Sequence, residues 1–206
     1  MNTLTFETPK HLGDAYGNLI RQVLITSSMA VKPVAYKLAD GGNFFTPSAD
    51  AVDMISFVSK LANLQISVDD SIQLPMILQV SGEGKIMSSQ LNRTGIQVTS
   101  KDEVLLEYFD NKPINLDIII DKNSGTVKSE DIRNNLMDKG IDVSSFRTIS
   151  CRFNNSIVNV SSKEVLDQDI VTIEINSEDK SETKKMRDAI KNIGSVLEEI
   201  AKNLHD

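Results

Sequence analysis

The sequence predicts an α+β fold in which both chain ends form one subdomain, a sheet with two amphipathic helices, and the middle forms an inserted β-rich subdomain. Three observations support this fold class. Apolar side chains recur at helical spacing in residues 13–28 and again in residues 181–204, and most segments between them alternate like strands separated by turn residues. We expect the first subdomain to comprise residues 1–30 plus 145–206, and the insert residues 31–144.

The N-terminal segment predicts a short strand followed by a helix. Thr3 to Glu7 alternates, with Leu4 and Phe6 on one side, and the strand is expected to end at Pro9. Gly13 to Ser28 repeats apolar residues every three or four positions. One face of this helix is therefore apolar, and it carries Tyr16, Leu19, Ile20, Val23 and Leu24.

The middle of the chain predicts strands and one short helix. The helix is expected around residues 51–61, with Ser48 or Asp50 as its cap. Ile96–Thr99 is expected to pair with Val104–Tyr108 across a four-residue turn. Further strands are expected at Val34–Leu38, at Ile77–Val80 before a turn at Ser81–Gly84, and at Ile114–Ile120.

The C-terminal part predicts strands at Thr148–Phe153, Val158–Val160 and Ile170–Ile175, followed by a long helix from about Ser181. Its apolar positions follow a 4-3 heptad spacing, which is typical of a seam against a partner helix. Burying each such side chain contributes about 1.5–3 kcal/mol. The alternative is that the stripe packs only on the chain's own sheet. The seam consists of Met186, Ile190, Ile193, Leu197, Ile200 and Leu204.

Composition excludes several classes of function. The net charge of −7 disfavours direct nucleic-acid binding, because phosphate affinity comes mainly from clustered Lys and Arg. Two histidines, His11 and His205, and one cysteine, Cys151, supply neither a catalytic triad nor a zinc site, and Cys151 is interpreted as a buried apolar residue. With no apolar run long enough to cross a membrane and no signal peptide, we expect a cytoplasmic protein without cofactors or metal.

Residues 13–28 read GDAYGNLIRQVLITSS, which resembles the signature helix of bacterial-type RNA polymerase alpha subunits, Leu-Gly-Asn-x-Leu-Arg-Arg-x-Leu-Leu-Ser-Ser. Gly and Asn inside a helix are costly by propensity, so this pair indicates a packing or functional requirement. The agreeing residues are Gly17, Asn18, Arg21, Leu24, Ser27 and Ser28, and similarity continues in order through Asp50–Ile66, Val80–Leu91, Val98–Leu106, Asn115–Val127 and Val165–Ile175.

The resemblance implies that the chain corresponds to the N-terminal dimerisation and assembly domain of this family. It also implies a non-catalytic subunit that binds the beta and beta-prime subunits. The chain ends just after Leu204, so we expect the family's C-terminal domain to be absent. The dimer interface is expected at Tyr16, Leu19, Ile20 and Val23 together with the heptad seam, and contact with beta or beta-prime at Arg21, Gln22, Ile25 and Lys60.

The sequence departs from the family where consecutive arginines are expected. Gln22 replaces the second arginine and lacks its charge and bidentate fork, which raises the hypothesis that the chain pairs with a different alpha-type chain. Residues 122–126 retain only one glycine of the family's Arg-Gly-Arg-Gly-Tyr segment. A homodimer and a heterodimer therefore both stay open, as do a small dimeric enzyme of unknown substrate and an archaeal or eukaryotic-type polymerase assembly subunit.

Overall fold

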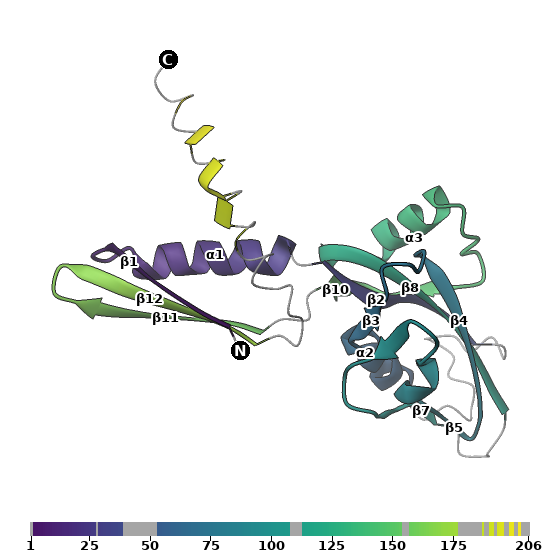
Figure 1. Cartoon of the computed structure of the whole chain (residues 1–206). Coiled ribbons are helices and arrows are strands. Elements are labelled where there is room, and N and C mark those ends of the chain that lie inside the picture. Colours follow the sequence, from purple (N-terminus) through teal and green to yellow (C-terminus); the bar gives the residue numbers. More distant parts are fainter. Residues whose placement is uncertain are drawn as a thin grey trace. The chain divides into compact units, whose positions relative to one another are not determined.

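The computed structural model describes residues 2–27, 29–38, 53–107, 113–153 and 157–176, with nine further positions between 187 and 202 (Figure 1). The chain divides into two compact units. The end unit comprises Met1–Ser28 and Asn154–Asp206, and the middle unit comprises Met29–Phe153. Both units are built on antiparallel strand pairs with few helices, so the fold is α+β.

The end unit contains a three-stranded sheet in the order β1-β12-β11, built from β1 (Asn2–Pro9), β11 (Ile157–Val165) and β12 (Gln168–Asn176). In β12 alternate residues are buried on one face. Helix α1 (Gly13–Ser27) covers this face (Figure 1). The core between them contains Leu24, Ile25, Val158, Val171, Ile173 and Ile175, with Leu4, Phe6, Ile20, Val23, Val160 and Ile190 packed against it.

The middle unit is organised around the long strand β8 (Pro113–Val127), which pairs with both β2 (Met29–Leu38) and β4 (Met76–Glu83). These strands belong to a seven-stranded sheet with the order β10-β8-β2-β3-β6, in which β4 also pairs with β8 and β9 with β2. Ile118, Ile119 and Ile120 are all fully buried, although they point to alternating faces. The centre of β8 is therefore covered by protein on both faces.

Shorter elements complete the middle unit. The Tyr36 ring on β2 meets the Phe57 ring on α2 edge-on, with centroids 5.1 Å apart. The two-stranded sheet β5-β7 lies outside the main sheet. These elements are α2 (Met54–Asn63), β3 (Ile66–Val68), β5 (Lys85–Met87), η1 (Ser88–Leu91), β6 (Ile96–Val98), β7 (Val104–Glu107), α3 (Ser129–Asp138), β9 (Arg147–Thr148) and β10 (Cys151–Phe153).

The predicted hairpin between Ile96–Thr99 and Val104–Tyr108 is wrong. Strand β6 pairs with β3, and β7 pairs with β5. The connecting residues bind η1 instead of forming a tight turn: Asp102 Oδ1 accepts from the Ser88 hydroxyl and the Ser89 N–H, each at 2.9 Å. The connection between β6 and β7 is therefore held at η1, and the two strands that the sequence pattern predicted to pair have other partners.

Strand β2 begins five residues earlier than the predicted start at Val34, because Pro33 is accommodated within it. The register shifts between Pro33 and Ala35, which is a bulge, and bulges tolerate the missing proline N–H. The extra residue, Val34, offers its carbonyl to the N–H of Ile149 at 2.9 Å. A proline in the sequence therefore marks an irregularity inside the strand and not its beginning.

Other boundaries also differ from the predictions. Helix α2 is capped by Asp53, whose carboxylate accepts from the Ser56 N–H at 2.9 Å, while the expected caps Ser48 and Asp50 lie outside the described residues. Strand β4 continues through the expected turn to Glu83. Thr148–Phe153 is interrupted, since β9 pairs with β2 and β10 with β8, and helix α3 was not predicted.

Candidate interaction surface

Helix α1 approaches its sheet closely because two glycines face the strands. A Cβ at Gly17 would lie 2.5 Å from Val160 Cγ1 and 3.1 Å from Val171 Cγ1. At Gly13 it would lie 2.3 Å from the Ser162 hydroxyl oxygen. The expectation that a glycine inside this helix has a packing reason is therefore confirmed, because any side chain at Gly17 would push the helix away from β11 and β12.

The start of α1 is held by a residue far away in the sequence. Asp169 on β12, only 5% exposed, accepts a hydrogen bond from the Gly13 N–H at 3.0 Å. This N–H is one of the first donors of the helix, which have no partner inside the helix, and the carboxylate also complements the positive end of the helix dipole. Sequence reasoning missed Asp169, because its partner lies 156 positions away and no local motif marks it.

A second apolar face of α1 stays uncovered. Leu12, Tyr16 and Leu19 are each 41% exposed. At 3.6 residues per turn they lie within an arc of roughly 60°, about a third of a turn away from Gly17 and Leu24, which face the sheet. Ile20 lies between the two faces, and Val23 falls within the arc of Leu12, Tyr16 and Leu19; both are half-buried and pack against the end-unit core. Leu12 was not predicted as part of this surface; it lies four residues before Tyr16 and extends the surface toward the N-terminus. We call Leu12, Tyr16 and Leu19 the α1 stripe.

The C-terminal seam is described only in part. The nine described positions between 187 and 202 are all helical. Ile190 is half-buried and packs against the end-unit core, and Ile193 is also half-buried. Ile190 therefore packs within its own chain, as expected if the stripe packs on the chain's own sheet. The other predicted seam residues, Met186, Leu197, Ile200 and Leu204, lie outside the described residues.

The residues expected to contact beta or beta-prime differ in accessibility. Arg21 is half-buried and its Nε donates to the Val158 carbonyl at 3.2 Å, which ties α1 to β11. Ile25 is 8% exposed in the end-unit core and leaves little surface for a partner. Gln22 is exposed. Lys60 belongs to the middle unit, where its Nζ donates to the Val104 carbonyl at 2.6 Å and links α2 to β7. Gln22 is therefore the most accessible member of this set.

Cys151 has the environment of a packing residue. It is 1% exposed, its thiol donates to the Pro33 carbonyl at 3.1 Å, and burial raises its pKa to about 12 despite the opposing field of Lys32. A thiol with this pKa stays protonated at neutral pH and is a poor nucleophile.

Two further features were searched for over the described part of the chain. No group of three or more His, Cys, Asp or Glu side chains is placed to hold a metal ion there. Among the same residues, no helix is both long and apolar enough to span a membrane.

Three bacterial proteins, each named DNA-directed RNA polymerase subunit alpha, are similar to 131 residues of this chain. Identity is 24% for those of Sulfurovum sp. (strain NBC37-1) and Campylobacter concisus (strain 13826), and 26% for that of Aliarcobacter butzleri (strain RM4018). The matched segment covers 63% of this chain but only about two fifths of each relative, 39–40%. No family model matches the chain. The similarity supports a distant relationship to bacterial RNA polymerase alpha subunits.

Proposed function

We propose that the chain is an alpha-type subunit of a DNA-directed RNA polymerase, a non-catalytic platform that dimerises and then binds the beta and beta-prime subunits. The observation that carries this proposal is the α1 stripe, an apolar surface that remains exposed on a helix whose other apolar face is already packed. The distant relationship to alpha subunits supports the same function.

In this proposal the end unit is the dimerisation subdomain and the middle unit is the inserted subdomain that reaches the large subunits. The α1 stripe of one protomer packs against the second protomer, together with Ile20, Val23 and the C-terminal seam. Each residue of the stripe is 41% exposed, so its burial adds on the order of 1 kcal/mol of apolar transfer free energy per side chain. The seam residues, including Ile193, supply the rest of the association energy.

Docking of beta or beta-prime uses the polar side of α1 beside this interface. Gln22 is its accessible member, while Arg21 keeps one guanidinium nitrogen bonded to β11 and has further donors to offer a partner. Ile25 and Lys60 act mainly by fixing the helices that carry the docking surface, given their burial and the Lys60 bond to Val104.

The experiment mixes the purified chain with purified beta and beta-prime subunits of the polymerase from the same cell and measures complex formation by size-exclusion chromatography. The proposal predicts a stable assembly with at least one large subunit. Gln22→Arg should strengthen capture by no more than about fivefold, because an exposed ion pair contributes about 0–1 kcal/mol. Asn18→Arg, at an exposed position elsewhere on α1, is the matched control. A dimeric chain that binds neither large subunit would overturn the assembly function.

A heterodimer is a second form of this function, and the exposed Gln22 in place of the family's arginine favours it. In a heterodimer one protomer binds beta and the other beta-prime, so only one of them needs the arginine. Native mass spectrometry after co-expression with a second alpha-type chain distinguishes the two forms. Predominantly mixed dimers would support the heterodimer, and exclusively self-paired chains would contradict it.

A further inference from the structure

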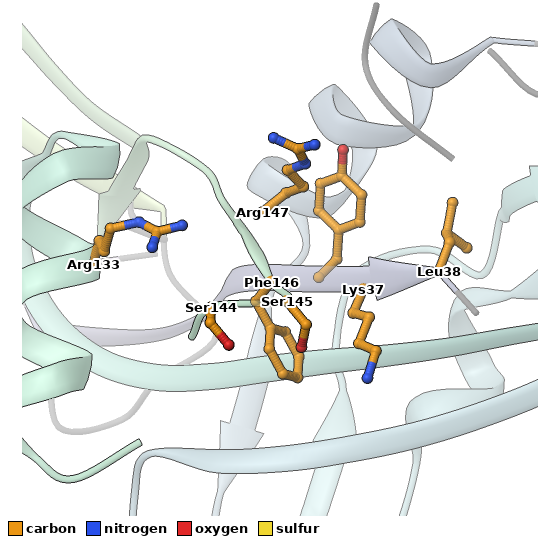
Figure 2. Close-up of a pocket in the computed structure, with 8 residues that line it drawn as sticks. Lys37, Leu38, Arg133, Ser144, Ser145, Phe146 and Arg147 are labelled. Carbon is orange, nitrogen blue, oxygen red and sulfur yellow. The ribbon is translucent and has the colours of Figure 1, made fainter. Parts of the chain in front are cut away.

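The pocket of the middle unit does not bring its charged side chains together (Figure 2). Its volume is about 260 Å³, and the cations that line it are Lys37, Arg133 and Arg147. Arg147 lies opposite Tyr36 in the pairing of β9 with β2 and shares its face. Lys37 is the next residue along β2 and points to the other face, as Figure 2 shows. The pocket therefore lacks a convergent set of cations for a ligand.

The three-stranded sheet of the end unit has two edges, β1 and β11. No strand in the described part of the chain pairs with the outer side of either edge. Pro9 on β1 has no N–H, and a proline in a sheet sits where its nitrogen faces away from the neighbouring strand. One residue earlier, the Thr8 hydroxyl donates to the Asp169 carbonyl on β12 at 3.5 Å, so this carbonyl is directed at β1. Because backbone groups alternate in direction along a strand, the outward N–H and C=O groups of β1 belong to Thr3, Thr5 and Glu7.

The two edges differ in how they are protected. Natural sheets protect an exposed edge with lysine, with a bulge or by covering its backbone. On β11 the Val158 carbonyl accepts from Arg21 Nε at 3.2 Å, and the exposed Lys163 lies further along the strand. Val160 and Ser162 share the outward direction of Val158. Strand β1 keeps one continuous register with β12 over eight residues and contains neither a lysine nor a bulge. Its outer edge is therefore open to another strand.

The α1 stripe lies on the side of its helix that faces away from β11. Arg21 reaches β11 from α1, and at about 100° per residue the residues of the stripe are rotated by roughly 140–200° from it. The stripe is therefore on the side of the end unit where the sheet ends in β1. On this strand, Leu4 and Phe6 point to the inner face and pack against the end-unit core, yet both are only half-buried. The open edge and the exposed apolar side chains thus occur on the same side of the end unit.

We propose that β1 pairs with β1 of a second copy of this chain, antiparallel across a twofold axis at Thr5, so that the two end-unit sheets join into one. On the outer face Thr3 lies opposite the partner's Glu7, and no like charges meet. On the inner face Leu4 lies opposite the partner's Phe6, which pairs apolar with apolar. An axis at Glu7 would instead oppose two carboxylates, and an axis at Phe6 would place Leu4 opposite a threonine. This inference rests on the proposed dimerisation and specifies its geometry.

The first test is amide hydrogen exchange of the full chain, resolved by residue with NMR, in samples that light scattering shows to be dimeric and, after dilution, monomeric. We expect the N–H groups of Thr3, Thr5 and Glu7 to exchange at least about tenfold more slowly in the dimer, because a hydrogen-bonded amide exchanges only when it opens. The outward amides of Val160 and Ser162 on β11 are the internal control and should exchange alike in both samples.

The second test removes one donor from the edge. Thr5→Pro deletes the N–H that donates at the twofold axis, and the fold tolerates proline there because this N–H faces away from β12. The dissociation constant of the dimer, measured by sedimentation equilibrium, should rise at least about tenfold. Thr5→Ala shortens the side chain but keeps the N–H, so it is the matched control and should dissociate like the wild type. An unchanged circular dichroism spectrum identifies a folded Thr5→Pro chain, and exchange in the wild type decides the question if this variant unfolds.

The outcomes separate the pairing from dimerisation itself. A folded Thr5→Pro chain as dimeric as Thr5→Ala would overturn the pairing. So would a dimer in which Thr3, Thr5 and Glu7 exchange as fast as in the monomer, and the proposed dimerisation would then stand. A chain that is monomeric at every concentration would overturn both. Slow exchange along β1 that does not change on dilution to the monomer would mean that the same chain covers this edge, and it would also overturn the pairing.

Discussion

The middle unit buries a much larger core than the end unit. Among the described residues, thirty buried side chains form the middle-unit core and six form the end-unit core. The centre of strand β8 in the middle unit is covered on both faces. The end-unit sheet buries one face under α1 and exposes Thr3, Thr5 and Glu7 on the other. Among the described residues, the middle unit therefore buries more apolar side chains within one chain than the end unit does.

Among its described residues, the end unit combines a core of six buried side chains with an apolar surface that stays partly exposed. Leu12, Tyr16 and Leu19 stay 41% exposed beside the packed face of α1. A small core supplies little net stability, and association with a partner is a common way to add to it. If this comparison is correct, changes in the middle unit should alter stability alone, and changes around α1 should alter both stability and association.

The largest expected effect is a cavity in the middle unit. Phe57→Ala removes a fully buried ring beside Tyr36 and should lower the free energy of unfolding of this unit by about 3–5 kcal/mol. Cys151, the only cysteine and 1% exposed, reports opening of the unit through its reaction with a thiol reagent. We expect labelling at least about a hundredfold faster, with unchanged oligomer mass. A loss of oligomer mass would show that the two units are coupled.

The next effect concerns the contact between α1 and its sheet. Gly17→Ala places a methyl group 2.5 Å from Val160 Cγ1 and should destabilise the end unit by about 1–3 kcal/mol, more than the gain of about 1 kcal/mol in helix propensity. Urea unfolding followed by circular dichroism measures this. The double variant Gly17→Ala/Val160→Ala should recover part of the loss, and the exposed Asn18→Ala should be close to neutral. A Gly17→Ala chain more stable than the wild type would disprove the close packing.

A smaller effect is expected at the start of α1. Asp169→Ala leaves the Gly13 N–H without its acceptor and should cost about 0.5–2 kcal/mol, the usual range for a lost cap. Asp169→Asn keeps an oxygen acceptor at the same position and should recover most of this loss. Thermal unfolding of both variants checks the prediction. Equal losses for alanine and asparagine would mean that the charge matters and that the hydrogen bond does not.

The smallest expected effect depends on pH. The Ser89 N–H and the Ser88 hydroxyl hold the pKa of Asp102 below its usual value. A carboxyl group whose pKa is lower in the folded than in the unfolded chain stabilises the fold at pH values above its unfolded pKa, which is about 3.9 for aspartate. This stabilisation is lost as the pH falls through the folded-state pKa. Asp102→Asn should therefore melt slightly lower than the wild type at pH 7, and the difference should shrink as the pH falls through the folded-state pKa of Asp102. A difference that persists in acid would contradict this assignment.

Periodic patterns predicted the elements that pack on one face. Residues 13–28 and Ile170–Ile175 became α1 and β12 because their apolar spacing matches one buried side. Pairings that depend on distant contacts were not predictable. Ser100–Glu103 resembles a turn, but Asp102 binds η1 and separates β6 from β7. Helix α3 was missed because only two of its residues, Ile132 and Leu136, are buried.

The candidate surface was only partly predictable for the same reason. The helical spacing of Tyr16 and Leu19 indicated an apolar face, but it could not separate this exposed stripe from the face toward the sheet. The sequence indicated a packing or functional requirement for the Gly-Asn pair in this helix, but it could not identify Val160 and Val171 as the side chains that Gly17 approaches.

The central claim, that the α1 stripe associates with a second chain, is tested most directly by sedimentation equilibrium across a dilution series. The wild type should have a mass of about 46 kDa, twice the 22.8 kDa of one chain. Leu19→Glu should sediment as a folded monomer, while Asn18→Glu, with the same charge change at an exposed position off the stripe, should remain dimeric. A monomeric wild type at every concentration, or a Leu19→Glu variant as dimeric as the wild type, would contradict the claim.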